Sequence, residues 1–166
     1  MRYLSLLLFL CLGLSSCDGG DASADAEMAA MEASRVAQQS AYDAMMAGHD
    51  RVMPLMGRIT ASQKAIMTEM KTEGLAADRK DLLEAANEQL QDAYDGMMDW
   101  MADLKPLDEL RANMDNDAII TYVKQEAGDI AKIEMSTATA LGTAKELMGD
   151  HAGHSHDGHD HDGHSH

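Results

Sequence analysis

Residues 41–70 read AYDAMMAGHDRVMPLMGRITASQKAIMTEM, and this stretch decides the fold. Apolar and long side chains recur in it at alternating spacings of three and four residues, which places them on one face of an α-helix. The pattern begins upstream of the stretch and has the form of a heptad seam with polar interruptions. The seam comprises Met28, Met31, Arg35, Gln38, Tyr42, Met45, His49, Val52, Met56, Ile59, Gln63, Ile66 and Met70.

Pro54 lies within this seam. A proline removes one backbone hydrogen bond from a helix, and its ring clashes with the preceding turn. Because the seam keeps its phase across Pro54, we expect a kink or a tight break that leaves the two halves nearly coaxial. The element ends at Glu73-Gly74-Leu75, where Gly74 fits a left-handed helix cap.

A second helical stripe follows this turn. It stops at Lys105-Pro106, because a proline disfavours the helical conformation in the residue before it, and a connector then runs to about Met114. The stripe comprises Leu83, Asn87, Leu90, Tyr94, Met97, Met101 and Leu104.

A third helical stripe begins after Asp115-Asn116-Asp117. These residues suit a helix N-cap, and their acidic groups are favourable at the positive end of the helix. Gly149 ends the element. The stripe comprises Ile119, Val123, Glu126, Ile130, Ile133, Thr137, Ala140, Ala144 and Leu147.

The three stripes predict an all-α fold. Each is too narrow to bury its helix alone, and short connections make successive helices antiparallel. We therefore expect an antiparallel up-and-down bundle of three long helices over residues 27–149, or of four if the first divides near Pro54. A membrane-tethered coiled-coil oligomer is the alternative assembly, although Arg35 and Gln38 on the first seam argue against a long dry interface there.

Residues 1–16 have the organisation of an export signal. The apolar run from Leu4 to Leu14 has the length of a signal-peptide core and is too short to span a bilayer. It ends in Leu14-Ser15-Ser16-Cys17, which resembles the lipobox of bacterial lipoproteins. The resemblance implies cleavage before Cys17 and a diacylglycerol thioether on that residue, with further acylation such as palmitate. An ordinary secretory signal with an incidental cysteine is the alternative.

An anchored chain would face the periplasm or the cell surface from the inner or outer membrane. Residues 17–26, rich in Asp, Gly, Ser and Ala, would serve as a flexible tether. Cys11, the only other cysteine, lies in the segment to be removed, so the mature chain has no internal disulfide. The chain has 29 acidic and 13 basic residues, and the resulting negative charge argues against nucleic acid as a partner.

Residues 150–166 form a tail of different composition, which we expect to be disordered. It holds seven of the eight histidines, six of them in three His-x-His pairs. In an extended chain residues two apart point the same way, so each pair can present two imidazoles to one ion. Imidazole suits Zn(II), Cu(II) and Ni(II), and carboxylates add hard donors. The expected ligands are His151, His154, His156, His159, His161, His164 and His166, with Asp157, Asp160 and Asp162.

Other interpretations of the tail stay open. It could be a cloning tag, a pH-responsive segment or a solvated low-complexity end. Metal binding needs neutral imidazole, so we expect it to fade as the pH falls below about 6 to 6.5.

The eighth histidine, His49, lies in a methionine-rich segment. Met45 and Met53 lie four residues to either side of it and share its helix face. If the chain turns back at Gly74, residues whose numbers sum to about 151 lie level, which brings the Met97–Met101 segment to this layer. Imidazole and thioether suit Cu(I), and the Trp100 indole can stabilise a cation. The sequence therefore offers a Cu(I) site made of His49, Met45, Met53, Met97 and Met101.

A plainer interpretation of this cluster is an adaptable core. Methionine is a flexible gap filler, and a histidine on a seam can be hydrogen-bonded to a neighbour such as Asp99. The two interpretations differ in what the sulfur atoms do, which the sequence leaves open.

The stretch His49–Met56, the Met97–Met101 segment and the third helix resemble small helical lipoproteins of Bacteroidota. The resemblance implies an exported helical domain without an established activity.

We find no nucleophile–base set and no phosphate-binding glycine loop, so we expect no enzyme. The leading hypothesis is an envelope lipoprotein whose tail binds Zn, Cu or Ni as a metal buffer, scavenger or carrier, close to a metal transporter or self-associated. The alternatives are a structural or protein-interaction helical lipoprotein and, less favoured, a pH sensor.

Overall fold

The computed structural model describes residues 20–149. The expected signal segment 1–16, the lipidation site Cys17 and the tail 150–166 lie outside these residues. The described chain is almost entirely helical and contains no strand, which confirms the all-α prediction. Its elements are α1 (Gly20–Val52), the short 3-10 helix η1 (Met53–Leu55), α2 (Met56–Glu69), α3 (Ala77–Asp103), α4 (Leu107–Asn113) and α5 (Asn116–Met148).

The chain forms two compact units, Met1–Val36 and Ala37–His166, and the boundary between them lies within α1. In the first unit the described residues are helical. Met28 and Met31 there expose 56% and 62% of their surface, so the seam is not buried at these two positions. Helical periodicity identifies a common face, but it does not identify what covers that face.

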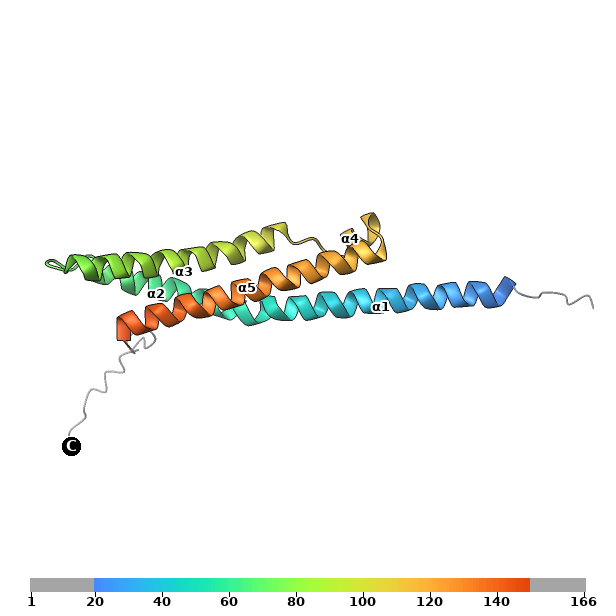
Figure 1. Ribbon diagram of the computed structural model, residues 1–166, viewed down its shortest axis with the longest axis horizontal. Helices are drawn as coiled ribbons and strands as arrows, with labels where there is room; N and C mark the ends of the chain where they lie inside the picture. The colour runs from blue at the N-terminus through green and yellow to red at the C-terminus, as the bar shows by residue number, and fades with distance from the viewer. Residues whose placement is uncertain (1–19, 150–166) are drawn as a thin grey trace, which may run out of the picture. The chain divides into compact units, whose positions relative to one another are not determined.

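The second unit is a bundle in which the chain runs up, down and up again. The helices α2, α3 and α5 pack on one another, and α3 runs opposite to the other two (Figure 1). Gln63 of α2 donates a hydrogen bond to Gln91 of α3, with 2.9 Å between the two side-chain atoms. The predicted antiparallel up-and-down arrangement of long helices is therefore confirmed.

Pro54 lies in η1, the 3-10 turn that separates α1 from α2. A 3-10 turn is a usual way for a helix to accommodate a local disturbance, because its hydrogen bonds connect residues one position closer than in an α-helix. Val52 before the turn and Met56 after it are both buried. The seam thus keeps its phase through the turn, and the break expected at Pro54 is confined to three residues.

The core of the second unit lies along the three predicted stripes. Most seam positions from Tyr42 to Met70 are buried or half-buried, as are those of the other two stripes. Alanines and one tryptophan on α3 complete the core beside the positions that the stripes identified. The fully buried large side chains are Met45, Val52, Ile59, Ile66, Leu83, Leu90, Met97, Leu110, Ile119, Val123 and Thr137.

The ends of the helices largely follow the sequence signals. Gly74 adopts a positive φ of 77° in the turn between α2 and α3, as expected for a left-handed cap. The Asp115 side chain accepts a hydrogen bond of 2.9 Å from the backbone N–H of Ala118 and so caps α5. The connector after Pro106 contains the short helix α4, which the sequence did not predict and which buries Leu107 and Leu110.

A polar contact network joins α1, α4 and α5. The buried Gln38 accepts a hydrogen bond of 3.0 Å from Arg111 Nε and donates one of 3.2 Å to Asn116 Oδ1. Gln38 is therefore a satisfied buried amide and not a defect in the seam. A buried amide with fixed partners also favours one register of the helices over others.

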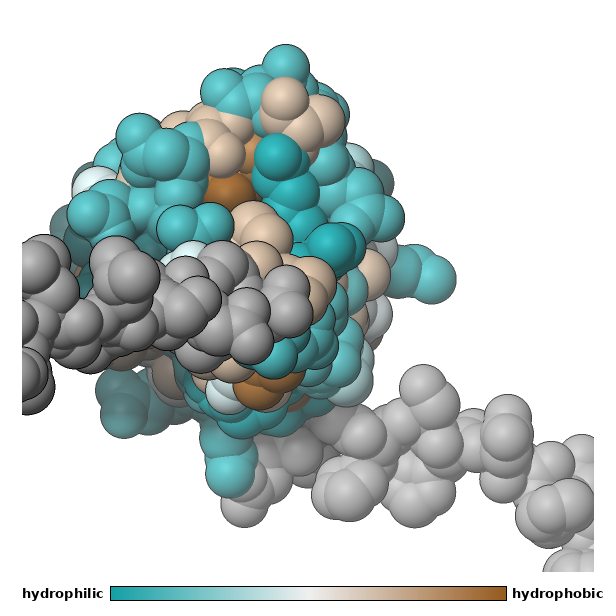
Figure 2. Space-filling view, turned by 90° about the vertical axis from the view of Figure 1, so that its right-hand side faces the viewer, coloured by the Kyte–Doolittle hydropathy of each residue, from teal (hydrophilic) through white to brown (hydrophobic). Residues whose placement is uncertain are grey.

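The face drawn in Figure 2 is mainly hydrophilic, with small apolar areas between polar side chains. None of the described helices carries an apolar stretch long enough to cross a membrane.

Candidate metal centre

The two sets of sequence-predicted ligands fall in different parts of the chain. The tail ligands, seven histidines and three aspartates from His151 to His166, lie outside the described residues. The helical set, which comprises His49, Met45, Met53, Met97 and Met101, lies within them.

The side chain of His49 on α1 contacts that of Trp100 on α3. Their ring centroids are 6.1 Å apart and the ring planes are inclined by 32°. Equal helix rise places His49 level with residue 102, which is two residues from Trp100. The layer itself is the predicted one, because the methionine-rich segments of α1 and α3 do meet there.

The imidazole of His49 is oriented by its neighbour in the sequence. Its Nδ1 atom lies 2.9 Å from Oδ1 of Asp50, within hydrogen-bond distance. The partner is thus Asp50 and not Asp99. The His49 side chain is 21% exposed, so it lies at the edge of the core and remains accessible to solvent.

The methionines of the predicted set lie at two depths in the bundle. Met45 and Met97 are fully buried, and both belong to the continuous hydrophobic core. Met53 and Met101 are half-buried and pack against that core. The structure therefore brings every member of the predicted helical set to one core or to its margin.

Trp100 is the aromatic residue that the sequence placed in this layer beside the predicted ligands. Only 6% of its surface is exposed, and its indole N–H has no hydrogen-bond partner among the described residues. Buried indoles usually find such a partner. The signal for its place was available in the sequence, since Trp100 lies one residue before Met101 and three after Met97.

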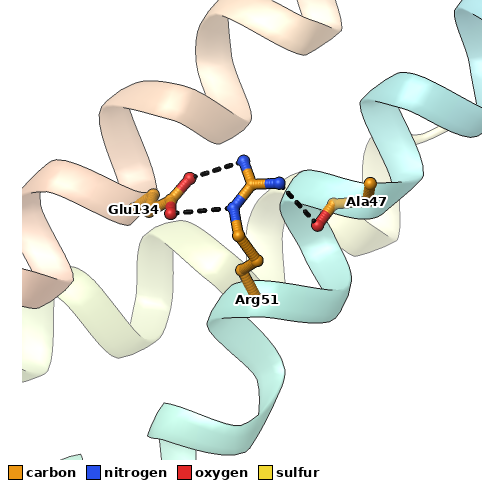
Figure 3. Close-up of polar contacts among 3 residues, drawn as sticks. All are labelled: Ala47, Arg51 and Glu134. Atoms are coloured by element: carbon orange, nitrogen blue, oxygen red, sulfur yellow. Dashed lines mark hydrogen bonds and ion pairs between the residues drawn. The ribbon is translucent and has the colours of Figure 1, made fainter.

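Two contacts hold α1 against α5 beside His49. Gly48 leaves room for Ile130, which lies so close that a β-carbon on Gly48 would be 2.9 Å from it. One turn of helix further on, Arg51 forms two hydrogen bonds with Glu134, of 2.9 and 2.8 Å, and a third with the carbonyl oxygen of Ala47 (Figure 3). The hydrogen bond with Arg51 lowers the pKa of the Glu134 carboxyl group below its usual value.

The end of the bundle that precedes the tail is held by Arg79. Its guanidinium group forms an ion pair with Glu69, at 2.7 Å from Nε, and donates a hydrogen bond of 2.6 Å to the carbonyl oxygen of Leu147. One side chain of α3 thus connects the end of α2 with the last turn of α5. The tail follows directly after this last turn.

The chemistry of the helical set is that of soft ligands. No group of three or more His, Cys, Asp or Glu side chains in residues 20–149 is arranged to hold a metal ion. The cluster instead offers one imidazole, several thioethers and an indole face. Thioethers bind Cu(I) in preference to harder divalent ions, and an indole face attracts a cation.

Comparison of the chain with protein-family models, with curated proteins and with solved structures found no match.

Proposed function

We propose that this protein is an envelope lipoprotein that binds Zn(II), Cu(II) or Ni(II) through residues 150–166 and serves as a metal buffer, scavenger or carrier. The observation that carries the proposal is the concentration of histidines in the tail, where three His-x-His pairs recur at intervals of five residues. Each pair supplies two imidazoles, and the aspartates between the pairs supply negative charge and oxygen donors.

The surroundings of the tail support this function. Arg79 holds the last turn of α5, so the bundle provides a fixed base from which the tail starts. The formal net charge of −16 attracts cations to the protein. A lipid on Cys17 would keep the protein at the membrane, where it could supply or protect a metal transporter.

The test is metal analysis of the protein purified without an affinity tag. The full-length chain is compared with a variant in which all seven tail histidines are replaced by asparagine, and with a chain that ends at Gly149. We expect the full-length chain alone to retain Zn(II) or Cu(II) at neutral pH, and to release it as the pH falls below about 6. A full-length chain that stays metal-free at micromolar free zinc and copper would contradict the proposal.

One observation favours a second function, that of a structural or interaction module. Met28 and Met31 continue the seam that is buried further along α1, yet both are more than half exposed. Exposed apolar residues at heptad spacing are typical of a helix that pairs with another helix. Sedimentation of the chain with and without the changes Met28→Glu and Met31→Glu would distinguish a self-associating protein from a monomer.

A further inference from the structure

We propose that the helical bundle carries a separate Cu(I) site, in which His49 Nε2 and methionine thioethers bind the ion beside the face of Trp100. This site goes beyond the metal binding proposed for the tail and does not depend on it. The candidate ligands are His49, Met45, Met53, Met97 and Met101, with Trp100 as the aromatic neighbour.

Two helix faces meet at the level of His49. Met45 and His49 are four residues apart in α1 and share a face, and Met97 and Met101 are four apart in α3 and share another. The contact between His49 and Trp100 brings these faces to one level. Met45 is therefore one helical turn from the single imidazole of the described bundle, and Met97 and Met101 lie within one turn of the indole that this imidazole contacts.

Asp50 orients the imidazole of His49. Because Asp50 lies at hydrogen-bond distance from Nδ1, its carboxylate favours the tautomer in which Nδ1 carries the proton. The lone pair is then on Nε2, where a metal ion can accept it. Histidines that bind metals commonly have a carboxylate on the other ring nitrogen, and this contact fixes both the ring and its tautomer.

The cluster combines access from solvent with a preference for soft ions. His49 is partly exposed, whereas Met45 and Met97 are fully buried, so the cluster extends from the surface into a dry core. A small monovalent ion can reach the imidazole from solvent and complete its coordination shell with thioether sulfur atoms. Neutral thioethers favour Cu(I) over Zn(II), because sulfur is a soft donor and residues 20–149 offer no group of three or more His, Cys, Asp or Glu side chains that could hold a harder ion.

Trp100 provides a direct measurement of the site, because it is the only tryptophan in the chain. A cation bound against the indole changes its fluorescence. The experiment uses the chain from residue 17 to 166 with Cys17→Ser and all seven tail histidines replaced by asparagine, so that neither the thiol nor the tail competes. Cu(I) is added without oxygen, with Ag(I) as a stable substitute, and affinity is measured by competition with a Cu(I) chelator.

We expect saturation of the Trp100 signal at one ion per chain, and no such change with Zn(II). His49→Leu should weaken Cu(I) binding at least tenfold. Met97→Leu, which keeps the apolar volume and removes the sulfur, should weaken binding severalfold. Met135→Leu is the matched control, since Met135 is 64% exposed on α5, and it should leave the affinity unchanged.

Thermal unfolding of each variant shows whether it is folded. If the His49→Leu variant does not fold, the Cu(I) affinity of the Met97→Leu variant tests the proposal. Unchanged Cu(I) affinity in folded His49→Leu and Met97→Leu variants would overturn the proposal and leave the cluster as core alone. An equal response to Zn(II), or no saturable response to Cu(I), would overturn it as well. Because the tail ligands are absent from this chain, these outcomes are independent of whether the tail binds metal.

Discussion

Gly48 of α1 and Ile130 of α5 approach so closely that a β-carbon on Gly48 would lie 2.9 Å from Ile130 Cγ2 and 3.2 Å from Cγ1. Ile130 is itself buried, with 2% of its surface exposed, so its side chain has little room to move away. The absence of a side chain at residue 48 therefore sets the separation of the two helices beside His49.

We predict that Gly48→Ala lowers the stability of the bundle. In an exposed helix this change raises the free energy of unfolding by about 0.5–1 kcal/mol, because alanine has a higher helix propensity than glycine. Overpacking in a core costs about 1–3 kcal/mol, and here it outweighs the gain. Urea denaturation measures the net effect as a lower midpoint.

Gly57→Ala is the matched control for this prediction. Gly57 lies in α2, is exposed, and has no atom within 4 Å of the position of an added β-carbon. The same substitution should therefore raise stability by about 0.5–1 kcal/mol. If both glycine variants were equally stabilised, the close contact between α1 and α5 would be refuted.

Thr137 provides a prediction of the opposite sign. It is fully buried on α5, and its hydroxyl group has no hydrogen-bond partner within residues 20–149. Thr137→Val replaces the hydroxyl with a methyl group of similar size and should stabilise the bundle by about 1 kcal/mol, because an unpaired buried polar group is removed. Thr139→Val is the comparison: the Thr139 hydroxyl donates to the Met135 carbonyl oxygen on an exposed face, and its loss should not stabilise. A Thr137→Val variant less stable than the parent chain would indicate a partner for the hydroxyl, such as a buried water.

The sequence predicted the faces of the helices better than it predicted their surroundings. The seam from Tyr42 to Met70 is largely buried because a strict spacing of three and four specifies one face of a helix. The same spacing continues back to Met28, which is exposed. Whether a face is covered depends on the path of the rest of the chain, and periodicity holds no information about that path.

The features that the sequence did not reveal depend on contacts between distant residues. Gln38 seemed only to interrupt the seam, because its partners Arg111 and Asn116 lie 73 and 78 residues away. Helix α4 has seven residues, too few for a periodic pattern to emerge.

The candidate site was predicted as a layer but not in its contacts. Equal helix rise was enough to bring His49 to the level of the Met97–Met101 segment. The shape of the turn between α2 and α3 decides where the second helix starts, and the spacing of residues along the chain does not give that shape. The pairing of His49 with Asp50 was not predicted, because a side chain on a helix can orient toward several neighbours.

Acid should weaken the contact between α1 and α5 through Glu134. The hydrogen bond with Arg51 lowers the pKa of Glu134 in the folded chain. A carboxyl group with a lowered pKa contributes stability above its unfolded pKa, near 4.5, and loses that contribution as the pH falls through the folded value. Glu69, whose pKa is lowered by its hydrogen bond with Arg79, acts in the same direction.

Urea denaturation between pH 7 and pH 3 measures this effect. Glu134→Gln should reduce the loss of stability on the acid side, because the titrating group is removed, and it should lower stability modestly at pH 7. Both partners of the pair are substantially exposed, so the effect should also shrink at high salt. Asp43→Asn is the control, since Asp43 is an exposed carboxylate that accepts a hydrogen bond from the neutral side chain of Gln39. An acid slope that Glu134→Gln does not alter would mean that other carboxylates govern acid unfolding.

Alkaline pH should lower stability at the break between α3 and α4, where two tyrosine hydroxyl groups are hydrogen-bonded to the backbone of Lys105. Tyr42 donates a hydrogen bond of 3.3 Å to the Lys105 carbonyl oxygen, and the Lys105 N–H donates one of 2.9 Å to the Tyr122 hydroxyl. Burial raises the pKa of both hydroxyl groups above the usual value of 10.0. The protonated tyrosines therefore contribute stability that is complete below pH 10 and is lost as the pH rises through the folded pKa values.

Tyr122→Phe tests this arrangement at two pH values. At pH 7 the variant leaves the Lys105 N–H without its acceptor and should lose about 0.5–1.5 kcal/mol. Between pH 9 and pH 11 its stability should fall less steeply than that of the parent chain, because one titrating hydroxyl is absent. Tyr94→Phe is a suitable control, since Tyr94 is a half-buried tyrosine of α3 at the same core. Equal alkaline slopes in the parent chain and in Tyr122→Phe would show that the Lys105 contact does not sense the titration of Tyr122.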